Sequence, residues 1–262
     1  MKKIFITILL ISILASCAPA ETITPTLVPS LTPPAPTVTS TPMPDALWVS
    51  PAVPANLLEL AQTWNIPRTD DLSLATQKLD IANSGALWIY ALVAPFPTVT
   101  DDVTDQDLLS LWSASSSGPL AGRGLLMAES TLEAFTALWG EPASGVVRIV
   151  SSDELIDTAW TESAWAIIPF EDIQPKWKVL SVDGQSPLHK NFDANVYPLK
   201  INFGLSSSSF ELPESNRDES KLATVVLTGV TALVRATAAT MELKGVTYPG
   251  SLIKDWLVGA DV

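Results

Sequence analysis

The central part of the chain alternates short apolar runs with segments in which apolar residues recur at helical spacing. The continuous runs predict buried strands, and the periodic segments predict amphipathic helices. We expect strands at 46–49, 87–93, 124–128, 146–150, 164–168 and 177–182, and helices at 54–64, 104–112, 130–139 and 152–160. Thr104 and Ser130 stand where N-cap residues are expected. Strands alternating with helices are typical of an α/β fold with a parallel or mixed, largely parallel, sheet and flanking helices.

The pattern changes after Leu205. Residues 206–221 are polar and charged and predict a linker or an exposed loop. Beyond them we expect a strand at 222–227 and helices at 232–244 and 251–257. A segment of this length is too short to bury a substantial core alone. Residues 222–262 are therefore expected to be an incomplete α/β segment, which either packs on the preceding domain or opens a second one.

The N-terminus carries an export signal. An apolar run, Ile4–Ala15, follows two lysines and is too short to span a hydrocarbon core of about 30 Å. It ends in Leu14-Ala15-Ser16-Cys17, which resembles the lipobox of bacterial lipoproteins. The resemblance implies cleavage before Cys17, acylation of its thiol, and an extracytoplasmic protein anchored to the cell membrane. Cys17 is the only cysteine, so no internal disulfide can form.

Threonine and proline dominate the sequence between Cys17 and the first predicted strand. Proline favours extended backbone at about 3.1 Å per residue, so this stretch could span roughly 80 Å. We therefore divide the chain into a signal peptide and lipobox (1–17), a Thr/Pro-rich linker (18–44), an α/β domain (45–205), a polar linker (206–221) and the incomplete segment (222–262).

The chain is acidic, with a formal net charge of −13. Loss of Lys2 and Lys3 with the signal peptide would move this charge from −13 to −15. A surface of this sign argues against nucleic acid and anionic lipid headgroups as partners. The charge does not indicate an oligomeric state.

Three loops carry hydroxyls at predicted strand ends or helix starts, and they are the candidate ligand-binding residues: Ser50, Thr98, and the pair Ser130 and Thr131. Helix N-termini and hydroxyls bind phosphate, carboxylates or sugars, so a small anion or a sugar is the expected ligand. The alternative is that Ser50 only forms a turn and Ser130 only caps a helix. No Arg or Lys lies close in sequence to any of the three loops, so Arg123 and Arg148 are candidate cations only if the fold brings them to the site.

Other chemistry-bearing residues have simpler interpretations. A lone His189 is typical of a loop residue, and Asp101, Asp102, Asp105 and Asp107 suit a helix start better than a metal. Tryptophans 64, 112 and 139 fall at core-facing positions. There is no Gly-rich phosphate loop, nucleophile elbow or zinc motif, so we predict no catalytic residues, no metal and no cofactor.

Two resemblances extend these predictions. LWVSPAVPANLLELA, LVAPFPTVTDDVTDQDLLSLWS and AWAIIPFEDIQPKWKVLSVDGQSP are similar to segments of type II periplasmic-binding proteins of the phosphate-binding kind. TGVTALVRATAATMELKGVTYPGSLIKDWLVGADV resembles the opening of a CapA-type domain, named for poly-γ-glutamate capsule synthesis. The resemblance implies an aspartate, a candidate metal ligand, where this chain has Val230, although Gly229, Leu233 and Arg235 match. The chain ends at Asp261-Val262, before the family's remaining metal ligands.

These observations leave several functions open. The leading hypothesis is a CapA-like surface lipoprotein with a solute-binding-like domain, in envelope or extracellular-polymer metabolism. The alternatives are the solute-binding component of an ABC importer, a truncated metallophosphatase-like hydrolase, and a scaffold without a ligand. Whether the protein is an enzyme stays open, although the missing metal ligand argues against activity in this chain.

Overall fold

The structure is a computed structural model that describes residues 45–115, 120–207, 210–227, 229, 234–251 and 253–262. The strands are β1 (Leu47–Val49), β2 (Gln77–Pro95), β3 (Asp102–Val103), β4 (Leu125–Met127), β5 (Val147–Ile149), β6 (Trp165–Pro169), β7 (Trp177–Val179), β8 (Ser181–Val182) and β9 (Lys200–Leu205). The helices are α1 (Ala55–Gln62), α2 (Asp105–Trp112), α3 (Glu129–Trp139), α4 (Leu155–Glu162), α5 (Ala236–Lys244) and α6 (Lys254–Gly259), with short 3₁₀ turns η1 (Phe170–Asp172), η2 (Glu219–Lys221) and η3 (Tyr248–Gly250).

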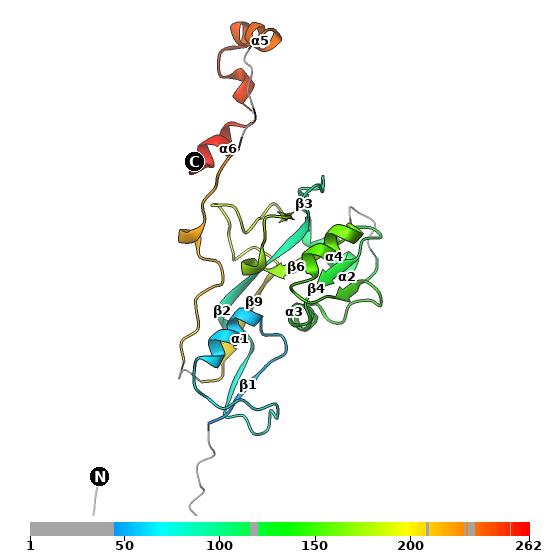
Figure 1. Cartoon of the computed structure of the whole chain (residues 1–262), viewed down its shortest axis with the longest axis vertical. Helices are drawn as coiled ribbons and strands as arrows, with labels where there is room; N and C mark the ends of the chain where they lie inside the picture. The colour runs from blue at the N-terminus through cyan, green and yellow to red at the C-terminus, as the bar shows by residue number, and fades with distance from the viewer. Residues whose placement is uncertain (1–44, 116–119, 208–209, 228, 230–233, 252) are drawn as a thin grey trace, which may run out of the picture. The chain divides into compact units, whose positions relative to one another are not determined.

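The long strand β2 organises a seven-stranded sheet in which β1, β6, β7 and β9 all pair with it (Figure 1). β1 is parallel to β2, whereas β6, β7 and β9 are antiparallel to it. β4 extends the sheet beyond β6 and is parallel to both β5 and β6. The expected α/β fold is confirmed, but the sheet is mixed rather than largely parallel. Of the four strands that pair with β2, one is parallel to it and three are antiparallel.

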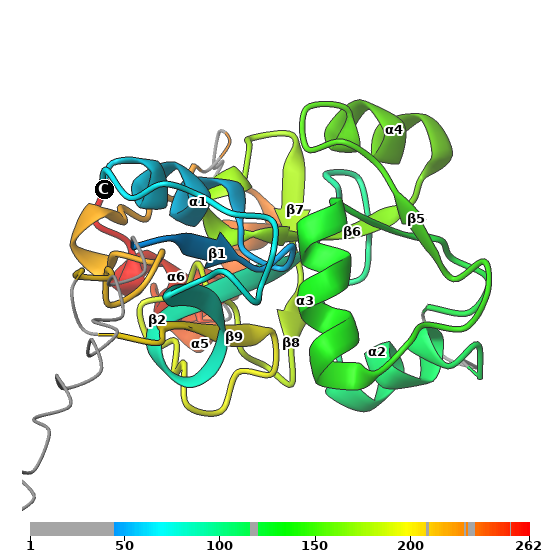
Figure 2. The ribbon, with the colours of Figure 1, turned by 90° about the horizontal axis from the view of Figure 1, so that it is seen from below.

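The sheet has two halves joined by β2. The first half holds β1, α1 and β9 beside the beginning of β2, and the second half holds β4 to β7 beside its end. Figure 2 shows α1 over β1 and places α2, α3 and α4 around the strands of the second half. Large apolar residues fill the space between helices and sheet, among them Leu57 of α1 and Phe135 of α3, both fully buried.

A bulge lets β2 run through both halves. Ile81 and Ala86 both face Phe203 of β9, so the residues between them bulge out of the ladder. Within the bulge Gly85 has φ +139°, and a Cβ there would lie 2.2 Å from the Phe203 carbonyl oxygen. Glycine is therefore required at this close approach of two backbones. We expected a strand only over 87–93, because the polar bulge interrupts the apolar pattern.

Helix starts agree with the sequence in one case and differ in another. Thr104 caps α2 as predicted: its Oγ1 accepts from the Asp107 N–H at 3.1 Å, and the Asp107 carboxylate accepts from the Thr104 N–H at 3.0 Å. Ser130 is not a cap, because α3 begins at Glu129 and its N-cap is Ala128, which has no side-chain cap bond. Ser130 lies inside the first turn instead.

The tryptophans expected in the core pack as predicted. Trp112 is 3% exposed and meets Trp139 edge to face, with ring centroids 5.2 Å apart. Trp139 in turn packs on Phe135 at 4.7 Å. Trp64 is half-buried and stacks on Phe210 at 5.0 Å. These rings fill core space, which leaves little of them for stacking on a sugar.

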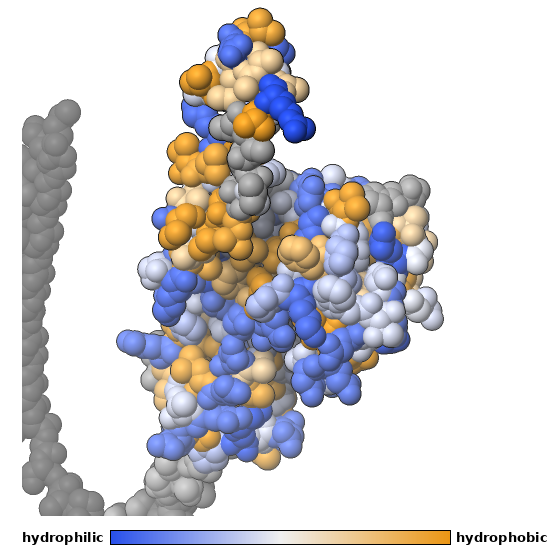
Figure 3. Space-filling view, turned by 45° about the horizontal axis from the view of Figure 1, so that its top comes forward, coloured by the Kyte–Doolittle hydropathy of each residue, from blue (hydrophilic) through white to orange (hydrophobic). Residues whose placement is uncertain are grey.

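The C-terminal segment differs from the expectation. No strand forms at 222–227, although Thr224 N–H donates to Asp261 Oδ2 at 2.8 Å and Asp261 N–H donates to the Thr224 carbonyl at 2.8 Å. The two expected helices are present as α5 and α6, while Val230 and Leu233 lie outside the described residues. Neither helix has a buried residue, and apolar side chains such as Leu243 and Trp256 are exposed. Figure 3 shows hydrophobic residues on the surface of the face that it presents.

Candidate functional site

The carboxyl ends of β1 and β6 point toward each other along β2. β1 runs parallel to β2 and ends at Val49, opposite Leu79, whereas β6 runs antiparallel and ends at Pro169, opposite Tyr90. In open α/β sheets, ligands bind outside the carboxyl ends of strands where the strand order reverses. We call the stretch of β2 between these two pairings, with the residues that contact it, the junction.

β1 and β6 lie on the same edge of β2. Successive residues of a strand direct their peptide groups to opposite edges. The Leu79 carbonyl accepts from the Ser50 N–H just after β1, whereas the Lys78 carbonyl accepts from the Ser206 N–H just after β9. The Leu92 carbonyl accepts from the Leu180 N–H just after β7. Leu87 and Ile89 therefore face the edge that β1 and β6 share, and β9 and β7 share the other. Residues from 214 to 216 occupy that shared edge at Leu87 and Ile89.

Two acidic residues follow β6 at the junction. Glu171 accepts a hydrogen bond from Trp88 Nε1 at 2.9 Å and another from Asn216 Nδ2 at 2.5 Å. Burial raises the pKa of Glu171 despite these hydrogen bonds, and burial raises the pKa of Asp172 as well. The ionised carboxylates are thus disfavoured at this position relative to water.

Two buried hydroxyls belong to the same region. Tyr90 is fully buried, and burial together with the negative charges of Glu171 and Asp172 raises its pKa well above the usual value. Its ring packs edge to face on Phe135, 5.1 Å away. Thr131, one turn before Phe135 at the start of α3, is 1% exposed. Among the described residues, neither hydroxyl has a hydrogen-bond partner, which is unusual for buried polar groups.

Ser50 is placed as the simpler interpretation expected. It is 9% exposed, and its Oγ accepts weakly from the Ala52 N–H at 3.4 Å in its own turn. Its N–H donates to the Leu79 carbonyl at 2.9 Å, which ties the turn to β2. Ser50 and Thr131 thus follow strands of different halves at their carboxyl ends.

Thr98 lies elsewhere, at the far end of β2. It lines a cavity of about 370 Å³ together with Thr100, Arg123, Trp160 and Ser163. Lys178 Nζ binds the Thr98 carbonyl at 2.7 Å and the Asp101 carboxylate at 2.6 Å, which fixes the loop. Arg123, one of the two candidate cations, therefore lines the same cavity as Thr98, whereas Ser50, Ser130 and Thr131 do not line it.

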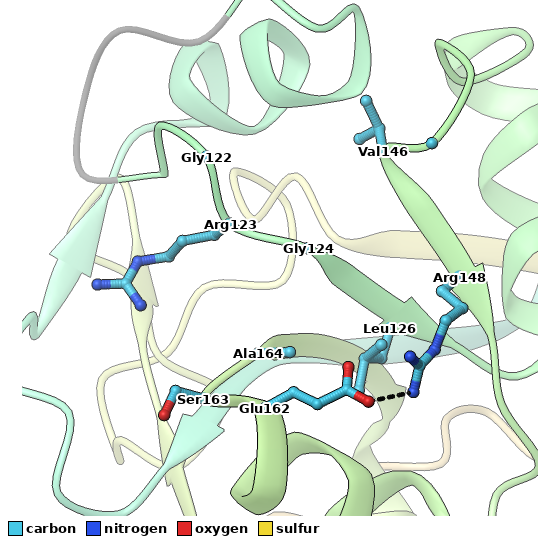
Figure 4. A pocket seen from close by; sticks show the side chains of 10 residues that line it. Gly122, Arg123, Gly124, Leu126, Val146, Arg148, Glu162, Ser163 and Ala164 are labelled. Carbon is cyan, nitrogen blue, oxygen red and sulfur yellow. Dashed lines mark ion pairs between the residues drawn. The ribbon is translucent and has the colours of Figure 1, made fainter.

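A second cavity, of about 400 Å³, shares Arg123 and Ser163 with the first. It lies at the amino ends of β4, β5 and β6, opposite the edge where α/β folds place ligands. Figure 4 shows Arg148 directed at Glu162, with which it forms an ion pair of 2.9 Å, while Arg123 extends away from this pair. The Arg123 guanidinium lies 5.0 Å from the Trp165 ring centroid.

The remaining residues singled out in the sequence have structural contacts. Asp102 accepts from the Gly184 N–H at 2.9 Å, and the His189 carbonyl accepts from Arg217 at 3.0 Å. Within the described ranges, no group of three or more potential metal ligands comes together. A search of these same ranges also finds no helix of the length and apolarity that a membrane crossing requires. Cys17 lies outside the described residues.

Sequence reasoning missed Tyr90, Glu171 and Asn216. Tyr90 sits in an apolar run, and Asn216 in a polar segment typical of loops. The one available signal was the acidic pair Glu171-Asp172 directly after a buried strand, a position where functional carboxylates are common.

Comparison with known proteins supports the fold. Neither any protein-family model nor any curated protein matches the sequence. Among solved structures, the chain is similar to an ABC-type phosphate transport receptor from Vibrio cholerae, with a TM-score of 0.51, 13% identity, and coverage of 62% of this chain and 85% of that one. A putative phosphate ABC transporter substrate-binding protein from Clostridium perfringens gives a TM-score of 0.42 at 12% identity, covering 63% and 86% of the two chains. The match to the Vibrio cholerae receptor confirms the periplasmic-binding-protein-like fold.

Proposed function

We propose that this chain is an extracytoplasmic lipoprotein whose α/β domain binds a small polar solute and is held at the membrane by a lipid on Cys17. The observation that carries the proposal is the fold, which the chain shares with a phosphate transport receptor. The lipobox-like Leu14-Ala15-Ser16-Cys17 supports the anchor. Multiple acyl chains give stable anchoring where a single chain does not.

The junction is the proposed solute site. It lies at the carboxyl ends of β1 and β6. Because β4 is parallel to β6, the first turn of α3, which follows β4, starts at the same edge of the sheet as the end of β6, and it carries the unpartnered Thr131 hydroxyl. A small anion or a sugar is the proposed ligand class. The raised pKa values of Glu171 and Asp172 favour the neutral carboxyl, which donates a hydrogen bond and therefore suits a solute that accepts one, such as a sugar or a small anion.

A thermal-shift screen of the full chain against inorganic phosphate, glutamate and glucose tests solute binding. A solute at a hundred times its Kd adds about 2.7 kcal/mol of stability and raises the melting temperature. Thr131→Val should leave the unliganded protein as stable or more stable, because it removes an unsatisfied buried hydroxyl, yet weaken solute binding about tenfold. Thr136→Val, two turns from the start of the same helix, is the control. If no compound raises the melting temperature, solute binding is wrong.

A second candidate places an anion in the cavities around Arg123, which combine a guanidinium with the Thr98, Thr100 and Ser163 hydroxyls. Arg123→Gln would then abolish a phosphate-induced shift that Thr131→Val leaves intact. The same pair of variants therefore distinguishes the two sites.

The C-terminal segment is proposed to begin a CapA-like domain, which would connect the protein to envelope or extracellular-polymer metabolism. The absence of buried residues in α5 and α6 suits a segment whose packing partners lie elsewhere. The alternatives are a component of an ABC importer and a truncated metallophosphatase-like hydrolase. An in-frame continuation beyond codon 262 that encodes an Asn and a Glu of a metal site would favour the hydrolase, and adjacent permease and ATPase genes would favour the importer.

A further inference from the structure

We propose that residues 214–216, which we call the strap, are an internal ligand of the junction, so that a solute binds there only after the strap has left. The inference rests on the proposed solute site at the junction. It concerns the regulation of that site, because the same edge of β2 cannot hold both occupants.

The backbone of the strap fills the open edge of β2 between β1 and β6. The Leu87 N–H donates to the Glu214 carbonyl at 2.8 Å, and Ser215 forms a parallel bridge with Leu87. An extended segment that adds to a free strand edge is a common form of peptide recognition. Here the added segment comes from the same chain.

The side chain of Asn216 makes the contacts that a bound solute would make. Its Oδ1 accepts from the Ile89 N–H at 2.7 Å, and its Nδ2 donates to the Ile89 carbonyl at 2.9 Å. Nδ2 also donates to Glu171 Oε2, in the turn that directly follows β6. One amide group thus satisfies a donor and an acceptor of β2 and the partly buried carboxyl of Glu171 after β6.

Arg217 anchors the strap outside the junction. Its Nε donates to the Pro187 carbonyl at 2.7 Å, its Nη2 donates to the His189 carbonyl at 3.0 Å, and the guanidinium lies 4.8 Å from the Phe192 ring centroid. Its side chain is 8% exposed. Residues 214–216 can therefore detach from β2 while Arg217 keeps them close, which raises their effective concentration at the edge.

The strap is held mainly by polar contacts that a solute can replace. Glu214 is exposed, and Ser215 and Asn216 are only partly buried. A hydrogen bond contributes little net free energy when water or a ligand takes over both partners. Exchange of the strap for a solute with similar donors and acceptors is thus a small change in free energy.

The first test weakens the strap. Asn216→Ala removes three hydrogen bonds from the bound strap, so we expect about tenfold tighter binding of the inorganic phosphate, glutamate or glucose probe that stabilises the wild type. Hydrogen exchange at the Leu87 and Ile89 amides should quicken in the same variant, even without a probe. Asn191→Ala, at an exposed position, is the control and should change neither measurement.

The second test locks the strap. In a full chain carrying Cys17→Ser, the substitutions Leu87→Cys and Ser215→Cys place two thiols at bridged positions suited to a disulfide. The oxidised protein should bind the probe at least tenfold more weakly than the reduced one, and reduction should restore binding. If the oxidised, reduced and Asn216→Ala proteins bind the probe equally, the strap does not compete and only this inference is wrong. If none of them binds any probe, including the reduced and Asn216→Ala forms, the proposed function fails and the inference fails with it.

Discussion

Gly85 decides whether β2 can pass through both halves of the sheet. A methyl group at Gly85 would have to lie 2.2 Å from the Phe203 carbonyl oxygen, and its φ of +139° disfavours any side chain. We expect Gly85→Ala to lower the free energy of unfolding by about 2–4 kcal/mol. Gly145 also has a positive φ, +80°, but open space around it, so Gly145→Ala should cost only about 1 kcal/mol. Urea denaturation of both variants measures the difference, and equal losses would contradict the role of the bulge.

Glu171 should make the stability depend on pH with a definite sign. Its pKa is raised from 4.5 by burial, so the folded state keeps a proton that the unfolded chain has already released. The contribution of Glu171 is therefore most favourable below pH 4.5 and falls as the pH rises through the raised value. As the pH rises from 4.5 through the raised pKa of Glu171, the Glu171→Gln variant should lose less unfolding free energy than the wild type. Urea denaturation at a series of pH values measures this loss.

Asp218 offers a control of opposite sign. The hydrogen bond from the Ser220 hydroxyl lowers the pKa of Asp218, so its contribution is gained as the pH rises. If Asp218→Asn changes the dependence of the unfolding free energy on pH in the same direction as Glu171→Gln does, then Glu171 is not the source of that pH dependence.

At the scale of elements, the capping box of α2 gives a simple comparison. Thr104→Ala removes the side-chain acceptor for the Asp107 N–H and should cost about 1 kcal/mol of stability. Ser130→Ala, in the first turn of α3 where no side-chain cap bond forms, should change stability by less than about 0.5 kcal/mol. Thermal unfolding of both variants tests this, and a larger loss for Ser130→Ala would restore its role as a cap.

The sequence pattern predicted most elements because their cores are locally apolar and periodic. It missed β9 although Ile201 and Phe203 alternate with polar residues as a half-buried strand requires. The start of β2 was missed for a different reason, because the bulge places polar residues and Gly85 inside the strand.

The candidate site could not be predicted from the sequence, because its residues lie far apart along the chain. Asn216 binds Ile89 across 127 positions, and Glu171 binds Trp88 across 83, so no local pattern connects them. The sequence offered Arg123 as a candidate cation without assigning it to one of the three loops; it lines a cavity with Thr98, at a different end of the sheet from Thr131.

At the scale of the whole molecule, attachment to the membrane should depend on the sulfur atom of Cys17. Cys17→Ala removes the thiol that would carry the lipid, so the variant should move from the detergent phase to the aqueous phase in a phase-separation assay. Wild-type protein expressed without lipoprotein-processing enzymes is the matched comparison. Detergent-phase recovery of Cys17→Ala would contradict acylation as the anchor.

Because β2 belongs to both halves without a break, the two halves share one continuous ribbon of backbone with β9. Many two-part proteins separate at a flexible loop, but here separation has to bend or twist hydrogen-bonded strands. Such a ribbon resists large rotations and permits small ones that are elastic and reversible. Motion in this protein should therefore be a shallow flexing of its backbone that concentrates at the bulge, where Ile81 and Ala86 bracket the only register shift between β2 and β9 in the part of the chain that the structure describes.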